Sequence, residues 1–367
     1  MRSFGGQVRK PTRSSRARVT IDDVAQRAGV SAMTVSRVVN AEKNVHPATR
    51  ELVLQVVREL NYAPNLAARS LAKADDIRIG LIYGNPSAAY LSEFLVGALD
   101  ESTTRGAQLF LVKSQGPGAD SAESAVQRLI DGGVAGAVLS SPLGESKPVS
   151  ERLAAAGVPS VAVSPGRFLG DISCVRIDDR RAAYEMTEHL LRLGHRRIGF
   201  IKGHPNQTAS AERLAGFEAA IAGQPGCETA VVQGYFTFQS GLEAAEELLD
   251  GPLHPTAIFA SNDDMAAAVV SVAHRRALDV PNDLTVVGFD DTAVATTLWP
   301  ALTTVRQPVS QMTAMAIDLL LHDIRARREG ENPPPVDRVI EHTIVQRNSS
   351  APPRTVGRRH RARGEPG

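Results

Sequence analysis

The chain has 367 residues, enough for roughly two or three domains that each bury their own hydrophobic core. Its formal net charge of +1 conceals an asymmetry, because residues 1–73 carry a net charge of +8, residues 74–347 one of −11 and residues 348–367 one of +4. The two cysteines, Cys174 and Cys227, lie too far apart to indicate a zinc site or a disulfide framework, and no apolar run approaches the roughly 20 residues of a membrane helix.

Both ends of the chain are basic and poor in residues that form a core. Residues 1–18 are rich in Gly, Ser and Arg and lack the apolar segment of a secretory signal. Residues 348–367 are rich in Pro, Gly and Arg. The sequence therefore predicts two disordered basic tails and a cytoplasmic location. A basic N-terminal part beside an acidic body is also typical of a module that binds polyanions.

The stretch Val19–Asn40, VTIDDVAQRAGVSAMTVSRVVN, has the pattern of two short helices joined by a tight turn. Thr20 is a favourable N-cap residue, and Asp23 follows three positions later, which is the spacing of a capping box. Gly29 tolerates the left-handed turn that ends the first helix, and Ser31 caps the second. The pattern predicts a DNA-binding helix-turn-helix, with a helical hairpin inside a larger helical domain as the alternative.

A third helix and a short polar segment follow. Pro47 suits the first turn of this helix, whose expected apolar stripe comprises Leu52, Val53, Val56, Val57 and Leu60. The next segment, NLAARSLAK at residues 65–73, is long enough for only about two helical turns, too few for a stable isolated helix. We therefore expect a DNA-binding domain at residues 19–64 and a hinge helix at residues 65–74 that orders on binding.

From Ile77 onward, apolar strand patterns alternate with helical patterns, beginning with RIGLIY at residues 78–83. Strands that are apolar along their whole length are typical of parallel sheets covered by helices on both faces. Roughly 270 residues of this pattern exceed one core, so we expect two doubly wound α/β subdomains. A ligand would then bind at the carboxyl ends of the strands, in the cleft between the subdomains.

Seven motifs in this order resemble the LacI/GalR family of bacterial transcription regulators: VTIDDVAQRAGVSAMTVSRVVN, RELNYAPNLAARSL, LGHRRIGFI, RLAGF, ASNDDMA, VVGFDD and LTTVRQP. The resemblance implies a DNA-binding headpiece, a hinge helix and a periplasmic-binding-protein-like core at residues 75–347 that acts as a dimer. Its subdomains would comprise residues 75–176 with 309–336 and residues 177–308 with 337–347. The stretch NPSAAYLSEFLVGALDES resembles the branch that responds to aryl-β-glucosides such as salicin.

The resemblance also implies DNA-contacting residues. The family's base-contacting pair falls on Ala32 and Met33, which are apolar here and suit thymine methyl groups. Arg37 matches the arginine that reads guanine. Leu71 matches a leucine wedged into the minor groove at the operator centre. The other positions expected on this surface are Thr20, Ser31, Thr34, Ser36, Asn40, Asn65 and Arg69, with simple helix capping as the alternative role of Ser36 and Asn40. His46 departs from the serine that often caps the third helix in the family.

A second set of residues matches effector-contacting positions. Arg213, Asn262, Asp290 and Gln307 supply hydrogen-bond donors and acceptors, and Phe236 offers a stacking face for a sugar. Ser164 stands where several sugar-responsive members carry an aspartate. Contacts from the first subdomain are expected from Asn85, Ser87 and Tyr90. A buried salt bridge is the alternative for Arg213 and Asp290, and a purely structural role is the alternative for Asn85, Ser87 and Phe236.

These patterns together predict a sequence-specific transcription regulator, a repressor that binds a pseudopalindromic operator in double-stranded DNA as a homodimer. A small sugar or glycoside would control it. We expect no catalytic residue, cofactor, metal or membrane contact. Two alternatives are a sugar-binding protein with a vestigial headpiece and a glycosidase that uses one of the paired aspartates, such as Asp263 with Asp264.

Overall fold

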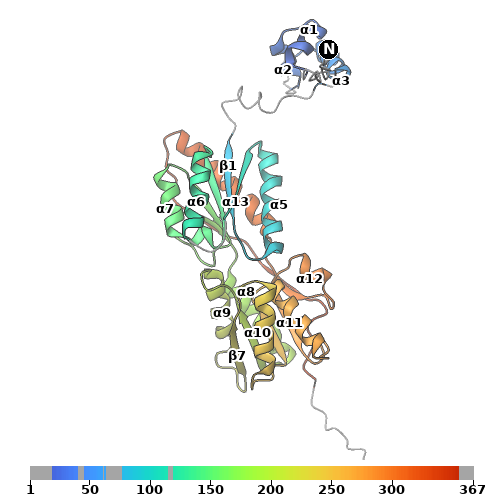
Figure 1. Cartoon of the computed structure of the whole chain (residues 1–367), viewed down its shortest axis with the longest axis vertical. Helices are drawn as coiled ribbons and strands as arrows, with labels where there is room; N and C mark the ends of the chain where they lie inside the picture. The colour runs from blue at the N-terminus through green and yellow to red at the C-terminus, as the bar shows by residue number, and fades with distance from the viewer. Residues whose placement is uncertain (1–18, 40–44, 61, 63–76, 115–118, 355–367) are drawn as a thin grey trace, which may run out of the picture. The chain divides into compact units, whose positions relative to one another are not determined.

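The computed structural model describes residues 19–39, 45–60, 62, 77–114 and 119–354, and the chain divides into two compact units, Met1–Asp76 and Ile77–Gly367 (Figure 1). The expected N-terminal tail, the expected hinge helix, Asn40 and residues 355–367 lie outside the described residues. Among the helices that are described, none combines the length and the apolar character needed to cross a membrane.

The first unit contains three helices, α1 (Ile21–Ala28), α2 (Ala32–Val39) and α3 (Pro47–Glu59). Its small core consists of Val24, Ala25, Ala28, Val35, Val38, Val53 and Val56. The expected stripe of the third helix is wrong at Leu52, which is exposed. Only one side of α3 is covered by the other two helices. Val53 and Val56 are buried there, and Val57 and Leu60 pack against the same core while partly buried.

In the second unit, the described residues form two six-stranded sheets. The first sheet has the order β11-β5-β4-β3-β1-β2, and all its strands are parallel. Its strands are β1 (Arg78–Tyr83), β2 (Gln108–Lys113), β3 (Gly136–Ser140), β4 (Ser160–Val163), β5 (Ser173–Arg176) and β11 (Asp337–Val339). The accompanying helices are α5 (Ala88–Arg105), α6 (Ala119–Asp131), η1 (Leu143–Glu145), α7 (Lys147–Ala155) and α13 (Val309–Arg328).

The second sheet has the order β12-β10-β9-β8-β6-β7, and within it only β12 is antiparallel to its neighbour. Its strands are β6 (Arg197–Lys202), β7 (Glu228–Gln233), β8 (Ala257–Ala260), β9 (Thr285–Asp290), β10 (Thr303–Arg306) and β12 (Thr343–Val345). Its helices are α8 (Asp179–Leu193), α9 (Thr208–Ile221), α10 (Phe238–Asp250), α11 (Asp263–Arg275) and α12 (Ala293–Thr297). The two α/β subdomains expected from the strand patterns are confirmed.

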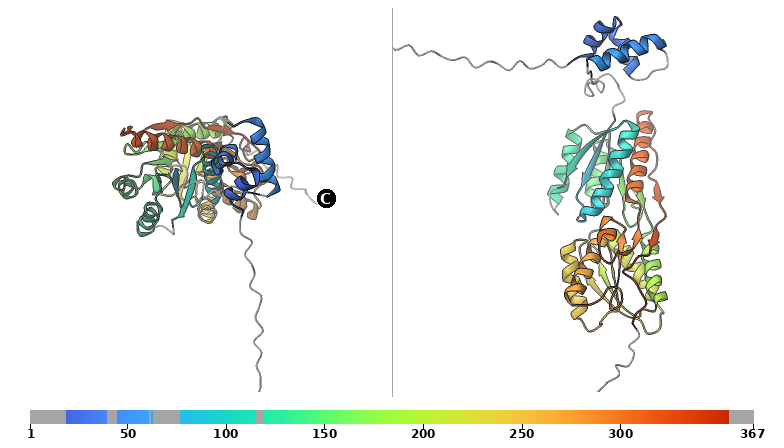
Figure 2. Two further views of the ribbon diagram at one scale, coloured as in Figure 1. Left: turned by 90° about the horizontal axis from the view of Figure 1, so that it is seen from above. Right: turned by 90° about the vertical axis from the view of Figure 1, so that its right-hand side faces the viewer.

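Close packing of α13 against α5 completes the first subdomain (Figure 2). Gly97 makes this packing possible, since a Cβ atom at this position would come within 2.7 Å of the Ser310 Cα atom. α13 also contacts β3, β4 and β5, so a helix distant in sequence covers one face of the first sheet.

Within the uninterrupted stretch 119–354, the chain passes three times between the subdomains: after β5, after β10 and after β11. The last passage corrects the expected boundary, because Asp337–Val339 pairs with β5 of the first sheet rather than joining the second subdomain. An ion pair between Arg176 and Asp337, with 2.8 Å between Nη2 and Oδ2, fixes this strand beside β5. Sequence periodicity carries no information about this partner.

The expectation of a disordered tail from residue 348 is also wrong for residues 348–354. Ser349 is buried; its Oγ donates to the Val286 carbonyl at 2.6 Å and accepts from the Thr303 amide at 2.8 Å. The Ala351 carbonyl lies 2.9 Å from His195 Nε2. The Ser349 hydroxyl bonds to backbone groups of β9 and β10 in the second sheet. Such hydrogen bonds order the segment although it lacks large apolar residues.

Candidate functional site

The turn between α1 and α2 is fixed by local hydrogen bonds. The capping box is confirmed, because Thr20 Oγ1 accepts from the Asp23 amide at 3.3 Å while Asp23 Oδ2 accepts from the Thr20 amide at 2.7 Å. The bonds that the Thr20 amide and hydroxyl donate to the Asp23 carboxylate lower the pKa of Asp23. Gly29 has a φ of 65° and ends α1, and Ser31 Oγ accepts from the Thr34 amide at 3.2 Å, which caps α2.

The outer face of α2 carries the side chains expected to contact DNA. Val35 and Val38 point into the core, whereas Met33 is 66% exposed and Arg37 is also exposed. Ala32, Thr34 and Ser36 are partly exposed on the same helix. Among the other expected contacts, Thr20 and Ser31 are exposed, while Asn40, Asn65, Arg69 and Leu71 lie outside the described residues.

His46 makes no capping hydrogen bond with its side chain, in contrast to the serine that often caps this helix in the family. The third helix begins instead with Pro47 in its first turn, a position where the missing N–H of proline does no harm.

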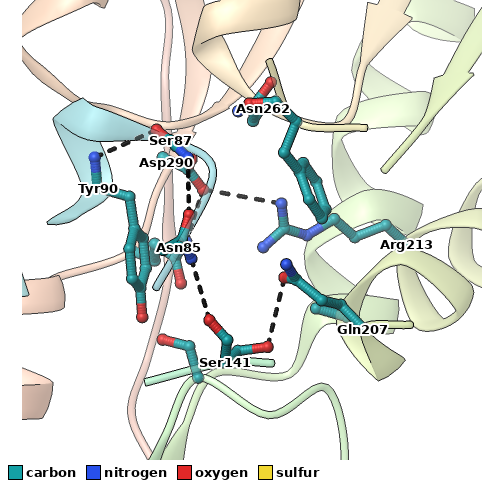
Figure 3. A pocket seen from close by; sticks show the side chains of 12 residues that line it. Asn85, Ser87, Tyr90, Ser141, Gln207, Arg213, Asn262 and Asp290 are labelled. Atoms are coloured by element: carbon teal, nitrogen blue, oxygen red, sulfur yellow. Dashed lines mark hydrogen bonds and ion pairs between the residues drawn. The ribbon is translucent and has the colours of Figure 1, made fainter. Parts of the chain in front are cut away.

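A polar cavity lies between the two subdomains, at the carboxyl ends of both sheets (Figure 3). All nine expected effector-contacting residues line it: Asn85, Ser87, Tyr90, Ser164, Arg213, Phe236, Asn262, Asp290 and Gln307. The cavity contains about 330 Å³ of empty space, part of it open to solvent, and only about 20 Å³ of it is wide enough for the centre of a water molecule. The structure thus brings together residues spread over more than two hundred positions of the sequence, in a closed cleft.

Three further lining residues, Ser141, Gln207 and Ala209, are not expected from the sequence. Ser141 directly follows β3, so its position after an apolar strand is a signal that points to the cleft. Gln207 precedes α9 and hydrogen-bonds across the cleft, its Oε1 accepting from Ser141 Oγ at 3.3 Å. We find no sequence signal for Gln207 or Ala209.

The backbone at the strand ends turns several side chains into the cavity. Ser164 after β4, Phe236 after β7 and Asp290 at the end of β9 have φ values of 59°, 62° and 112°. Residues other than glycine rarely adopt positive φ, and such strain is typical of functional sites. The Phe236 ring covers Gly203 so closely that a Cβ atom there would overlap it.

Arg213 is the centre of a buried charge network. Its Nε lies 2.7 Å from Asp179 Oδ1, its Nη1 lies 3.7 Å from Asp290 Oδ1, and its Cζ lies 3.6 Å from the centre of the Phe289 ring. Only 4% of the residue is exposed. The buried salt bridge considered as an alternative is therefore present, and the same side chain also lines the cavity.

Asp290 is an acid whose protonation changes near neutral pH. Burial raises its pKa to about 7, although Arg213 and the hydrogen bond from Gln307 act in the opposite direction. Gln307 Nε2 donates to Asp290 Oδ1 at 2.6 Å. Since Gln307 lies on the second passage between the subdomains, the charge in the cleft is linked directly to a segment that connects them.

Ser87 and Asn262 have structural roles in addition to lining the cavity. Ser87 Oγ caps α5 by accepting from the Tyr90 amide at 3.3 Å, and it donates to Asp264 Oδ2 of the other subdomain at 2.6 Å. Asn262 Oδ1 caps α11, and its Nδ2 donates to the Phe236 carbonyl at 3.0 Å. Asn85 similarly accepts from the Ser87 amide and donates to the Ser141 carbonyl.

Four other lining groups are buried and have no hydrogen-bond partner outside this set among the described residues: Gln207 Nε2, Gln307 Oε1, and Tyr90 Oη with Ser164 Oγ, which contact only each other. A buried polar group without a partner costs about 1–3 kcal/mol. Four such groups around one cavity favour a ligand that both donates and accepts hydrogen bonds.

Comparisons with known proteins agree with a helix-turn-helix headpiece followed by an α/β core. Residues 20–65 match the model for "Bacterial regulatory proteins, lacI family", and residues 187–350 match that for "Periplasmic binding protein-like domain". The catabolite control protein A of Priestia megaterium is 36% identical over 305 residues, which cover 82% of this chain and 91% of that protein.

The chain belongs to the lacI family of bacterial regulatory proteins.

Two solved structures extend the likeness of this lacI-family protein to almost the whole fold. The complex of the transcriptional regulator CelR with cellobiose is 33% identical and has a TM-score of 0.67; the alignment covers 91% of this chain and 100% of that one. The lac repressor dimer bound to operator and the anti-inducer ONPF is 27% identical, with a TM-score of 0.72 and coverage of 91% and 99%.

Membership of the lacI family decides between the functional classes considered from the sequence. The protein is a DNA-binding transcription regulator, because its headpiece and its α/β core both match that family. The family consists of regulators rather than enzymes, so the paired aspartates are not those of a glycosidase. A sugar-binding protein without regulatory DNA binding is not favoured either.

Proposed function

We propose that the protein represses transcription by binding a pseudopalindromic operator as a homodimer, and that a small sugar or glycoside in the cleft controls this binding. The observation that carries the proposal is the cavity itself. One polar cavity collects every effector-contacting residue expected from the sequence, in a chain that also carries a helix-turn-helix.

Each side of the cavity has a part in holding the effector. Arg213 and Asp290 donate to and accept from sugar hydroxyls, and Gln307 adds an acceptor beside them. Phe236 stacks against an apolar face of the sugar ring. From the first subdomain, Tyr90 and Ser164 offer hydroxyl groups whose only partner among the described residues is each other.

Effector control requires the cleft to change shape. The space wide enough for a water centre, about 20 Å³, is far below what a sugar ring occupies, so the effector binds a more open arrangement of the subdomains. Bonds across the cleft, such as Ser87 to Asp264 and the Thr208 amide to Glu145 at 2.8 Å, oppose that opening. A ligand with different affinities for the two arrangements shifts the population between them.

On the DNA side, Arg37 reads guanine, while Ala32 and Met33 contact thymine methyl groups. Two copies of α2 in a dimer occupy successive major grooves, which accounts for a pseudopalindromic operator. The hinge at residues 65–74, with Asn65, Arg69 and Leu71, binds the minor groove between them. Such a protein works in the bacterial cytoplasm and associates with the nucleoid when it is bound to DNA. The aryl-β-glucoside branch stays a prediction.

The experiment is a selection of operator DNA from a random pool by the purified full-length protein at physiological salt, followed by gel shifts with sugars and glucosides. We expect enrichment of a palindromic site and release of that site by one class of carbohydrate. Equal affinity for all DNA sequences would contradict the regulatory function. A specific site that no carbohydrate affects would contradict only the nature of the effector.

A further inference from the structure

We propose that the cleft selects an uncharged, hydroxyl-rich carbohydrate and discriminates against sugar phosphates and sugar acids. This inference rests on the proposed function, because it specifies the effector of the same cleft. Three observations support it: Arg213 is already paired with a carboxylate, carboxyl groups outnumber cations around the cavity, and the N-termini of the surrounding helices are capped.

The first observation is that Arg213 is already neutralised. Among the described residues that line the cavity, it is the only one that carries a positive charge. Asp179 holds its Nε at 2.7 Å, and the Ser261 carbonyl accepts from its Nη1. The Phe289 ring covers one face of the guanidinium. A phosphate or carboxylate that entered the cavity would therefore have to compete with a buried ion pair for this cation.

The second observation is a surplus of carboxyl groups. Asp290 lines the cavity, and Asp264, Asp179 and Glu145 are each joined to a lining residue by a hydrogen bond or an ion pair. Asp263 directly follows the lining residue Asn262. Burial raises the pKa of Asp263, of Asp264 and of Asp290, because removal from water disfavours their charged forms. A second anion would meet repulsion in a poorly screened site.

The third observation concerns three helices that begin at the cavity, α5, α9 and α11. The N-terminus of a helix is a ready-made site for phosphate groups. In this protein, a side chain of the protein itself accepts a hydrogen bond at the N-terminus of each of these helices. Ser87 Oγ caps α5, Asn262 Oδ1 caps α11, and Glu145 Oε2 accepts the Thr208 amide at the start of α9. At each of these N-termini, one of the amide groups that could otherwise hold a phosphate is thus already bonded.

The groups that remain match hydroxyls rather than anions. Tyr90 Oη and Ser164 Oγ can donate or accept, Gln207 Nε2 donates, and Gln307 Oε1 accepts. A sugar hydroxyl also donates and accepts, so it can satisfy all four groups. A fully ionised phosphate only accepts, so it cannot donate to Gln307 Oε1.

The test compares neutral sugars with their charged counterparts on the full-length protein by titration calorimetry at pH 7.5. The pairs are glucose with glucose 6-phosphate, ribose with ribose 5-phosphate, galactose with galacturonate, cellobiose with cellobiose 6′-phosphate, and salicin with salicin 6-phosphate. Coulomb repulsion from one carboxylate at about 6 Å, in a medium of effective dielectric constant about 20, predicts binding on the order of 100-fold weaker for the charged member.

A variant sharpens the comparison. Asp179→Asn removes the charge that neutralises Arg213 and does not alter a lining residue, so we expect it to strengthen the binding of a sugar phosphate on the order of 10-fold. Asp250→Asn is the matched control, since it removes a carboxylate from an exposed ion pair with Arg276 that lies outside the cleft. The wild-type comparison decides the matter even if Asp179→Asn does not fold.

The outcomes separate the two proposals. Tighter or equal binding of a charged member overturns the selection of uncharged ligands and leaves the regulatory function standing. If neither member of any pair binds, while operator binding persists, sugar control and this inference both fail. Binding by a neutral member alone, with discrimination reduced in Asp179→Asn and unchanged in Asp250→Asn, supports the inference.

Discussion

The headpiece and the cleft place their functional side chains in opposite ways. In the headpiece, Val24 and Val35 form the core, while Met33 and Arg37 project from it. In the cleft, the residues expected to bind the effector also hold the fold together, because Arg213 and Asp290 are almost completely buried in one network. Function and stability are therefore separable in the headpiece and combined in the cleft. Substitutions offer direct ways to test this difference.

The largest effect is expected from Arg213→Met. The substitution leaves Asp179 and Asp290 buried without a cation, and breaking such a pair destabilises a protein by about 3–5 kcal/mol. Chemical denaturation measures the loss. Arg275→Met is the control: it breaks an exposed pair with Glu246, for which about 0–1 kcal/mol is expected. Equal effects of the two substitutions would show that the cleft network is not structural.

Arg37→Ala should separate DNA recognition from stability. We expect a loss of about 1–3 kcal/mol of discrimination at one base of each half-site, with a change of at most about 1 kcal/mol in the stability of the headpiece, because Arg37 is exposed and exposed polar contacts contribute little. Binding to operator and to random DNA, measured at one salt concentration, gives the specificity ratio. Arg27→Ala, on α1, serves as the control; it should weaken both kinds of DNA by a similar factor. An unchanged ratio in Arg37→Ala contradicts the assignment.

A smaller effect on the free energy of unfolding is expected from the titration of Asp290 with pH. Its pKa is about 7 in the folded protein and about 3.9 in the unfolded chain, so between these values the folded state binds the extra proton. The contribution of Asp290 to stability is complete below about pH 4 and falls as pH rises through 7. From pH 5 to pH 7 the loss is about 2 kcal/mol, since one pKa unit corresponds to about 1.4 kcal/mol.

The measurement is the free energy of unfolding of wild type minus that of Asp290→Asn across this pH range. The difference cancels the contributions of His189 and His195, whose pKa values are lowered by burial and whose effect on stability has the opposite sign. It reports Asp290 together with its effect on Asp263, whose pKa is raised by burial and by the charge of Asp290. A pH-independent difference would show that Asp290 is already ionised at pH 5.

Local signals in the sequence predict much of the headpiece. The helix ends are set by hydrogen bonds between residues only a few positions apart, so the spacing of these residues in the sequence predicts each end. The residues concerned are Thr20 with Asp23, Gly29 and Ser31. Leu52 shows the limit of this reasoning. Its periodicity fits the apolar stripe, but coverage by other helices decides its burial.

Residues that line the cleft can be predicted where they follow apolar strands or belong to family motifs. Their partners in the structure are harder to predict. Asp179 is the main partner of Arg213, and Gln207 reaches Ser141 across the cleft. These partners are set by how two sheets are placed against each other, which no local pattern encodes. The strand at Asp337–Val339 is similar: its sheet is decided by pairing with β5 and by the ion pair of Asp337 with Arg176.

The three passages of the chain between the subdomains, all within residues 119–354, have a consequence for recombination. To exchange one α/β subdomain between two relatives, recombination must occur at three positions, near residues 177, 308 and 341. A single crossover would combine strands from two different proteins in one sheet. The headpiece ends before Ile77 and needs one joint only. Operator preference can therefore be inherited as a module, whereas ligand preference must diverge one side chain at a time within a shared scaffold.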